Sequence, residues 1–391
     1  MGLPVVPAYC GDPRRTPKDH QRPQRYRDLP RTAWLPSLLR AVLPGLREHV
    51  AADGRRTAGA CRVTQSHVRE LESELAEAFG LPYAVAVSSG TAALHTALVA
   101  AGIGPGDEVA VPAACVPMTV AAITYTGARP VLIDGTGHQI TPATRAVMAV
   151  HLAGRCTDLP KLADFATAHG LRLIEDACQA QGSEYAHRPA GSYGDAGCFS
   201  LKDGKILSAG EGGYLLTHDA DLAEQARRFR THLPVDHHRA GPRFGHNYRM
   251  PELTAAQARR ALQEFPAKLA RRRAQAMLLM KLVEGTPRVR PMHPPPQENW
   301  NGYSALFHLD LPRPRDFCAH LSEAGVPNSI GTYGLISADQ LPAMAAFRPT
   351  RCPQAAKFLD HTLAVVLSEQ DDDDRIRHLA HTIAKEARSW N

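Results

Sequence analysis

The stretch YAVAVSSGTAALHTALVAA, residues 83–101, decides the fold class of this 391-residue chain. It begins with a short apolar run, Tyr83–Val87, which is typical of a strand buried on both faces of a sheet. A turn of two serines and a glycine leads into Thr91–Ala101, whose alanines and leucines favour a helix. A strand followed at once by a helix is the unit from which parallel α/β sheets are built.

The same alternation continues on both sides of this stretch. Strands are expected at Glu108–Val111, Pro130–Ile133, Val147–His151, Leu171–Ile174 and Gly213–Thr217, and helices at Val63–Phe79, Val116–Thr126, Lys161–His169 and Asp221–Arg230. Short, nearly all-apolar strands between helices predict a mostly parallel central sheet covered on both faces. The fold class is therefore α/β.

The rest of the chain has a different pattern. We expect a short helix at Pro36–Leu43, an antiparallel strand at Tyr303–Leu309, and helices at Pro251–Phe265, Lys268–Val283, Arg315–Ala324 and Arg375–Ser389. The predicted organisation is a basic, proline-rich arm at 1–34, a large domain at 35–262 and a smaller α+β C-terminal domain at 263–391.

Composition excludes several classes of protein. No run of about 18 apolar residues exists, so no membrane-spanning helix is expected, and without an apolar segment near the N-terminus a cytoplasmic enzyme is the expectation. The basic stretch 13–31 raises the possibility of nucleic-acid binding, but no nucleic-acid motif or aromatic spacing follows, which favours an arm lying over the protein or a neighbouring subunit. The histidines and cysteines lack metal-ligand spacings, so no metal is expected.

A polar turn follows the first strand of the opening stretch. Parallel α/β sheets place their working groups at the carboxyl ends of strands. Gly90 allows backbone N–H groups to converge there, and the hydroxyls of Ser89 and Thr91 flank it. A helix N-terminus of this kind binds an anion, most simply a phosphate. Ordinary N-capping by Ser89 or Thr91 explains the same residues equally well.

Acidic and amide side chains follow the strand at Leu171–Ile174. Glu175 and Asp176 come directly after it, and Gln179 lies three residues further on. A partly desolvated carboxylate at that point needs a partner, and a protonated ring nitrogen is one candidate. The alternative is an aspartate that caps a helix.

Two lysines stand in a loop of small residues at 197–213. The loop contains Lys202 and Lys205 and ends in the turn Gly210-Glu211-Gly212-Gly213. A recessed lysine amine suits covalent chemistry with a carbonyl group. The alternative, a solvent-exposed lysine, fits Lys202 better than Lys205. A phosphate turn, a carboxylate and a recessed lysine, in this order on one sheet, match the needs of pyridoxal 5′-phosphate (PLP).

At this point the chain resembles the DegT family of sugar aminotransferases, within the fold-type I PLP enzymes. Matching stretches include Ser89–Leu94, Gly104–Val109, Gly191–Ser200, Gly210–Gly213 and Asn247–Met250. The resemblance implies the fold-type I PLP transferase fold. It also implies an aminotransferase that moves an amino group from L-glutamate or L-glutamine to a keto sugar or keto cyclitol, in the biosynthesis of aminoglycosides, other secondary metabolites or amino sugars.

The resemblance also implies roles for individual residues. Lys205 would be the catalytic residue, linked to the cofactor and moving the proton, while Asp176 would pair with the ring nitrogen and Gln179 would contact the ring hydroxyl. Family members with histidine in place of the lysine tend to be dehydratases, so Lys205 favours the aminotransferase branch. A PLP-dependent sugar dehydratase or lyase, and a non-catalytic PLP-binding homologue, are the alternatives.

The remaining implied contacts concern the phosphate group. Gly90, Thr91 and Ser200 would hold it from one subunit. Asn247 would reach the phosphate of a neighbouring subunit, which implies a homodimer with composite active sites.

The chain departs from the family pattern at two places. Val116 stands where an aromatic residue usually stacks on the cofactor ring, and Ala153 stands where an aromatic residue often follows the His-Leu pair. Val116 can contact the ring face but supplies no aromatic stacking, and a wider or differently shaped substrate cleft is expected from Ala153. The loop Lys205–Gly213 is nearer to members that act on inosose-type cyclitols, and nucleotide-linked sugars remain a close competitor.

Overall fold

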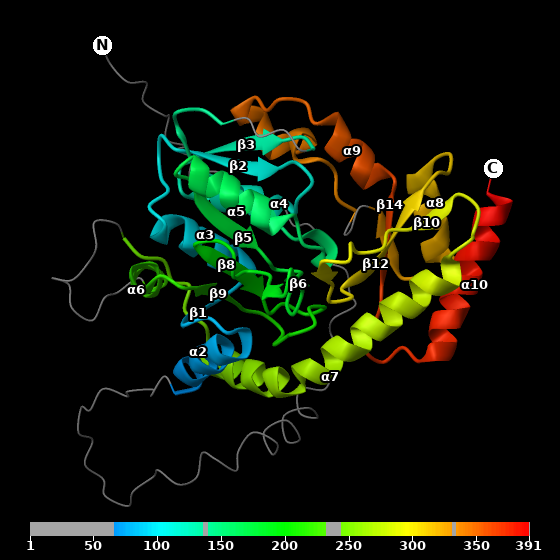
Figure 1. The fold of residues 1–391 in the computed structure, drawn as a ribbon, viewed down its shortest axis with the longest axis horizontal. Coiled ribbons are helices and arrows are strands. Elements are labelled where there is room, and N and C mark those ends of the chain that lie inside the picture. Colours follow the sequence, from blue (N-terminus) through cyan, green and yellow to red (C-terminus); the bar gives the residue numbers. More distant parts are fainter. Residues whose placement is uncertain (1–65, 136–139, 232–243, 331–333, 391) are drawn as a thin grey trace, which may run out of the picture. The chain divides into compact units, whose positions relative to one another are not determined.

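The computed structural model describes residues 66–135, 140–231, 244–330 and 334–390. The predicted arm at 1–34 and the predicted helix at Pro36–Leu43 lie outside these residues. Within the described ranges the chain forms two main sheets joined by one long helix (Figure 1).

A seven-stranded sheet has the strand order β1-β9-β8-β5-β4-β2-β3. Strand β9 runs antiparallel to β1 and β8, and the other neighbouring strands pair in parallel. The predicted mostly parallel sheet is therefore confirmed. The strands are β1 (Tyr83–Val87), β2 (Glu108–Pro112), β3 (Arg129–Ile133), β4 (Thr144–Val150), β5 (Arg172–Asp176), β8 (Ala196–Ser200) and β9 (Gly213–Thr217).

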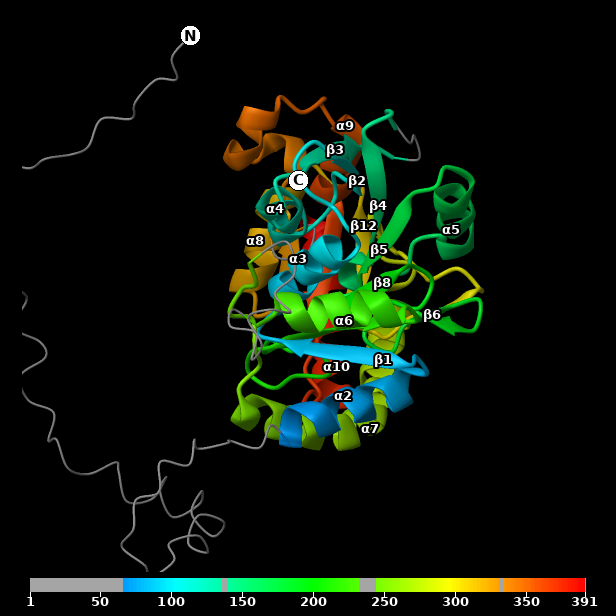
Figure 2. The same cartoon turned by 90° about the vertical axis from the view of Figure 1, so that its left-hand side faces the viewer.

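Helices cover both faces of this sheet because side chains alternate along its strands. Val85 and Val87 of β1 pack with helices α3, α4 and α6, whereas Ala84 and Ala86 pack with α2 and α7. Figure 2 shows α5 on the side of the sheet opposite α3 and α4. The helices are α2 (Ser66–Phe79), α3 (Gly90–Ala100), α4 (Pro117–Tyr125), α5 (Leu159–Ala168) and α6 (Ala220–Phe229).

A second, antiparallel sheet has the order β10-β12-β14-β13 and packs against α8 and α10. Its strands are β10 (Val289–Pro291), β12 (Ser304–Leu309), β13 (Asn328–Ile330) and β14 (Thr362–Val366), and the helices of this part are α8 (Pro314–Glu323), α9 (Pro353–Asp360) and α10 (Asp373–Ser389). The antiparallel strand and both helices predicted here are present, whereas α9, β13 and β14 were not predicted.

Short elements complete the described fold. They are the strands β6 (Glu184–Tyr185), β7 (Arg188–Pro189) and β11 (Glu298–Asn299), which form a small three-stranded sheet, and the 3-10 turns η1 (Leu152–Gly154), η3 (Ala338–Gln340) and η4 (Pro342–Phe347). None of the helices in the described ranges combines the length and apolar character that crossing a bilayer requires.

The prediction of two helices at Pro251–Phe265 and Lys268–Val283 is wrong. Both segments belong to one helix of 32 residues, α7 (Glu252–Val283), with Pro266 inside it. Figure 1 shows α7 passing from α2 beside the large sheet to α10 beside the small one. Packing at both ends holds the helix together across the proline. The predicted domain boundary between residues 262 and 263 falls inside α7 and stays a prediction.

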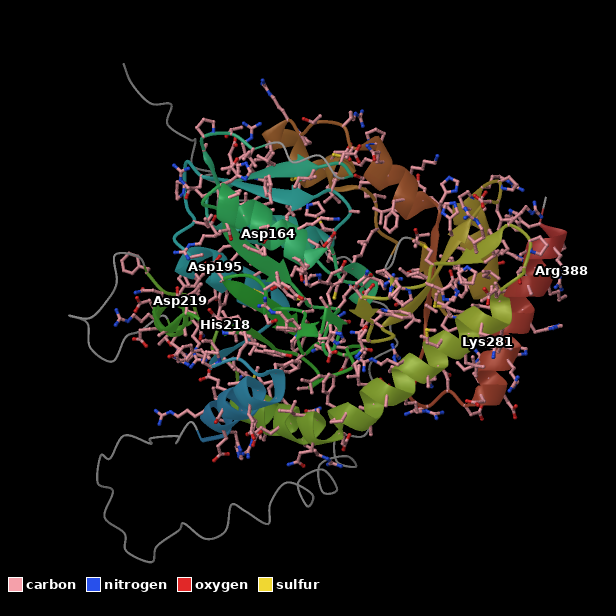
Figure 3. The ribbon with its side chains drawn as sticks, in the orientation of Figure 1. Asp164, Asp195, His218, Asp219, Lys281 and Arg388 are labelled. Carbon is pink, nitrogen blue, oxygen red and sulfur yellow. The ribbon has the colours of Figure 1, made fainter. Side chains whose placement is uncertain are left out.

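Two aspartates, Asp195 and Asp219, lie at the edge of the large sheet where its parallel strands begin, and both make hydrogen bonds within the fold. Figure 3 labels Asp195, His218 and Asp219 there. Asp195 binds Arg172 at 2.5 Å and accepts the backbone N–H of Leu173, and Asp219 caps α6. In parallel α/β sheets, ligands bind at the opposite edge, where the strands end.

Pro266 offers a test of the continuous helix. Proline in a helix interior has no N–H to donate and costs about 3 kcal/mol relative to alanine. Because Pro266 is exposed, we expect Pro266→Ala to raise the free energy of unfolding by about 1–3 kcal/mol in a urea titration followed by circular dichroism. The neighbouring exposed control, Ala267→Gly, should lower it by about 1 kcal/mol. A Pro266→Ala protein of lower stability would contradict this reading of α7.

Candidate active site

Strands β1, β4, β5 and β8 end at the same edge of the large sheet, and the residues that follow them surround one cavity. Its volume is about 370 Å³. Of the residues predicted for the site, it is lined by Gly90, Thr91, Asp176, Gln179, Ser200 and Lys205. Asn247, the remaining predicted residue, lies outside this lining. The fold thus brings together residues spread over more than a hundred positions of sequence.

At the predicted phosphate turn, the start of α3 lies very close to the end of β8. Ser89 caps α3, since its Oγ accepts the N–H of Ala92 at 3.1 Å. A Cβ atom on Gly90 would lie 2.8 Å from the Cβ of Ser200 and 2.9 Å from the Sγ of Cys178. Only glycine fits here, and its N–H stands at the start of a helix beside a serine hydroxyl. Capping by Ser89 is confirmed, and phosphate binding by the N–H groups beside it stays a prediction.

Asp176 is the last residue of β5 and is only 6% exposed. Its Oδ2 accepts the Thr119 hydroxyl at 2.6 Å, and its Oδ1 accepts the backbone N–H of Cys178 at 3.2 Å. These two partners are neutral. A buried carboxylate with neutral partners favours a cation in the cavity beside it, and a protonated ring nitrogen meets that need.

Glu175 precedes Asp176 in the same strand but does not line the cavity. Its carboxylate accepts the backbone N–H groups of Gly191, Tyr193 and Gly194 at 2.7–2.8 Å, and it lies 3.0 Å from Nε2 of His151. Successive residues of a strand point to opposite faces. Glu175 therefore organises the far side of the site and orients His151, which does line the cavity.

Gln179 and Lys205 also line the cavity. The Oε1 of Gln179 accepts the N–H of Ala153 at 2.6 Å, so its NH₂ group is the part that can donate to a ligand. The Nζ of Lys205 donates to the hydroxyl of Tyr303 at 3.3 Å. Lys202 also lines the cavity but is exposed, whereas Lys205 is half-buried.

Buried side chains and hydrogen bonds hold the loop that carries Lys205. Ile206 and Leu207 are buried, and the side chain of Gln181 donates to the carbonyls of Ser200 and Leu207 at 2.8 and 3.0 Å. The buried pair anchors the backbone next to the lysine. The amine can therefore move within the cavity while its attachment point stays fixed.

The two departures from the family pattern both border cavities. Val116 lines the first cavity at the start of α4. Ala153 has a left-handed backbone (φ 57°) and lines a second cavity of about 360 Å³, which shares Val150 and Leu152 with the first. The second cavity extends to Leu306 of the small sheet, and the wider substrate cleft stays a prediction.

Asn247 is exposed, and its neighbours are fixed. Nδ1 of His95 lies 3.1 Å from the hydroxyl of Tyr248, and its ring packs edge-on against His246. Burial and the nearby His246 lower the pKa of His95 to about 4, so it is neutral at physiological pH. The contacts of His95 with His246 and Tyr248 hold the segment on both sides of the exposed Asn247.

Sequence reasoning missed four residues that complete the site: Thr119, His151, Cys178 and Tyr303. Cys178 lies inside a motif that the sequence did single out, between Asp176 and Gln179. His151 directly follows β4, so the rule used for Asp176 could have found it. Thr119 lies inside α4, and no strand end points to it. Tyr303 lies about a hundred residues from Lys205, and no local pattern connects the two.

Comparison with known proteins agrees with this geometry. The sequence profile of the DegT/DnrJ/EryC1/StrS aminotransferase family matches residues 55–384. A UDP-N-acetyl-3-dehydro-alpha-D-glucosamine 3-aminotransferase of Acidithiobacillus ferrooxidans is 34% identical over 89% of this chain and 96% of its own length. The L-glutamine:scyllo-inosose aminotransferase of Streptomyces griseus is 40% identical over 47% of this chain and 46% of its own length.

Solved structures show the same fold. The crystal structure of S. venezuelae DesV, in complex with a ketimine intermediate, has a TM-score of 0.75 and 29% sequence identity to this chain. The match covers 82% of this chain and 89% of DesV.

The cradle at Gly90 can be tested directly. The Cβ of Gly90→Ala meets Ser200 and Cys178 below 3.0 Å, so we expect PLP to bind at least about tenfold more weakly. Fluorescence or absorbance titration of the cofactor-free protein measures the change. Ser88→Ala, in the same turn but outside the cavity lining, is the control and should bind PLP as the wild type does. Unchanged binding by Gly90→Ala would contradict the assignment of this turn.

Proposed function

The chain belongs to the DegT/DnrJ/EryC1/StrS aminotransferase family, and we propose that it moves an amino group from L-glutamate or L-glutamine to a keto sugar or keto cyclitol. It is a PLP-dependent aminotransferase of the fold-type I class. The observation that carries the proposal is one cavity that holds the phosphate cradle at Gly90, the buried carboxylate of Asp176 and the amine of Lys205.

The residues of this cavity divide the work between binding and proton transfer. When bound, PLP supplies an electron-withdrawing ring that stabilises negative charge on the carbon next to the amino group. Gly90, Thr91 and Ser200 are placed to hold its phosphate, and Asp176 to keep its ring nitrogen protonated. The NH₂ group of Gln179 is placed to donate to the ring hydroxyl.

Lys205 is placed to act as the acid and base. Freed from its covalent linkage, the amine would take the proton from the substrate carbon as a base and would later give it up as an acid. In the second half-reaction, with the keto acceptor, the same amine would move the proton in the opposite direction. The buried residues Ile206 and Leu207 hold the backbone next to this amine.

The names of two relatives support the proposed class of amino acceptor. One acts on a nucleotide-linked amino-sugar precursor and another on scyllo-inosose, by their names. The space next to Val116 and Ala153 accommodates a ring substrate of either class. We propose roles in aminoglycoside, other secondary-metabolite or amino-sugar biosynthesis, in the cytoplasm.

We also propose that two copies of the chain form a homodimer with composite active sites. Asn247 is exposed and is absent from the lining of the cavity of its own chain, and it precedes Tyr248, whose hydroxyl lies 3.1 Å from Nδ1 of His95. An exposed amide in this position is available to the phosphate site of a second copy.

Lys205→Ala tests the catalytic assignment. Loss of the positioned acid and base should lower the rate of amino transfer from L-glutamate or L-glutamine by roughly 10²–10⁴-fold. Stopped-flow absorbance after donor addition measures this rate. Lys202→Ala, the exposed lysine of the same loop, is the matched control for the loop itself and should retain far more activity. Wild-type turnover by Lys205→Ala would contradict the assignment.

Composite sites predict complementation between two inactive variants. In a mixed dimer of Lys205→Ala and Asn247→Ala protomers, one site carries both changes and the other carries neither. We therefore expect activity to appear when the two proteins are unfolded together and refolded, although each alone is impaired. Activity that never exceeds the average of the two separate proteins would contradict a site shared through Asn247.

A PLP-dependent sugar dehydratase or lyase shares the cofactor and much of the site. It differs in its products, because a transaminase releases a keto acid from the amino donor in amounts equal to the cofactor converted. Detection of 2-oxoglutarate from L-glutamate therefore separates the two functions.

A further inference from the structure

Tyr303 lies against the amine of Lys205. Its hydroxyl accepts a hydrogen bond from Nζ of Lys205 at 3.3 Å, and the centre of its ring lies 5.0 Å from the same nitrogen. The side chain is 3% exposed. A hydroxyl oxygen and the face of an aromatic ring both attract a positively charged amine.

The segment that carries Tyr303 is fixed to the strand ends of the large sheet. The indole of Trp300 donates to the carbonyl of Ala153 at 3.0 Å, and the amide of Asn301 donates to the carbonyl of Gln179 at 2.8 Å. Oδ1 of Asn301 in turn accepts the N–H of Tyr303 at 2.9 Å. Since Ala153 and Gln179 themselves border the active site, these bonds set the place of Tyr303 relative to the cavity.

A second set of contacts holds the same segment from the side of α7. The buried side chain of Arg272 donates to the carbonyl of Tyr303 at 2.9 Å. A Cβ atom on Gly154 would lie 2.1 Å from Oδ1 of Asn301, so the chain packs here as closely as glycine permits. Tyr303 thus has a fixed backbone on both sides, immediately before β12 of the small sheet.

We propose that Tyr303 is the positioning residue of Lys205. When Lys205 takes a proton from the substrate carbon, the C–H bond breaks, an N–H bond forms and the amine becomes an ammonium group. The hydroxyl oxygen of Tyr303 accepts a hydrogen bond from this group and holds the amine in one position until it gives the proton up. The inference rests on the proposed aminotransferase function, and it adds a residue from the C-terminal part of the chain to the site.

A purely structural role for Tyr303 makes a different prediction. The ring belongs to the apolar cluster formed by α2, α7 and the large sheet. A phenylalanine would fill the same space, so a packing role needs the ring and not the hydroxyl. The change Tyr303→Phe separates the two roles because it removes one oxygen atom and keeps the ring.

The test compares Tyr303→Phe with Tyr214→Phe. Tyr214 is a fully buried tyrosine of the same cluster, and it lies outside the cavity lining. In single turnovers of the PLP-loaded enzyme with L-glutamate or L-glutamine, Tyr303→Phe should lower the rate constant about tenfold, the effect of one hydrogen bond to a charged group. The donor concentration at half-maximal rate should stay within about twofold, because the change acts on proton transfer and not on binding. Tyr214→Phe should behave as the wild type does.

A second readout needs neither cofactor nor turnover. In the cofactor-free protein, acetic anhydride at one fixed pH should modify Lys205 several-fold faster in Tyr303→Phe than in the wild type, because the amine is no longer held against Tyr303. Mass spectrometry of the peptide that contains Lys205 measures this rate, and the exposed Lys202 serves as internal reference.

Wild-type single-turnover rates together with unchanged labelling of Lys205 in Tyr303→Phe would overturn the proposal and leave Tyr303 as a core residue. If that variant fails to fold, a crystal structure of the wild-type enzyme with the aminated cofactor, in which the amine of Lys205 is free, decides, and a Tyr303 hydroxyl beyond hydrogen-bond distance of Nζ would also overturn it. These outcomes differ from a failure of the proposed function, in which the wild-type enzyme itself converts no donor.

Discussion

The carboxylate of Asp176 is the constraint on which the rest of the site depends. It ends β5 in a nearly dry position and is held by a hydroxyl and one backbone N–H. Burying a charge with neutral partners is costly unless a cation shares the space. The neighbouring Glu175 shows the contrast, because three backbone N–H groups and His151 satisfy it completely on the other face. Two adjacent acids therefore differ in their surroundings: Glu175 is satisfied within the protein, whereas Asp176 borders the cavity.

The remaining parts of the site follow from where this carboxylate stands. The parallel strands on either side of β5 end at the same edge, so the phosphate cradle at Gly90 and the loop of Lys205 lie around one cavity. The contacts of the segment around Tyr303 add the small sheet to this arrangement. The C-terminal part of the chain thereby contributes to the position of the amine.

Much of this arrangement could be predicted from sequence, since it depends on local patterns. Apolar runs between helices indicated the parallel sheet. The turns after two predicted strands indicated Gly90 and Asp176, and a loop of small residues indicated Lys205. The strand β8 was missed because its small residues resemble a loop, and its strand character comes from pairing with β5 and β9. The break predicted at Pro266 was wrong because packing of α7 at both ends outweighs the loss of one hydrogen bond. Tyr303 could not be found at all, since its role exists only through contacts between distant segments.

The central claim is that this cavity binds PLP and passes an amino group to it from an amino acid. The most direct measurement is the visible absorbance of the purified, PLP-loaded protein before and after addition of L-glutamine or L-glutamate. The account predicts a yellow protein whose band shifts to that of the aminated cofactor, with an equivalent amount of keto acid released. A protein that stays colourless with added PLP, or a yellow one whose spectrum ignores both donors, would contradict it.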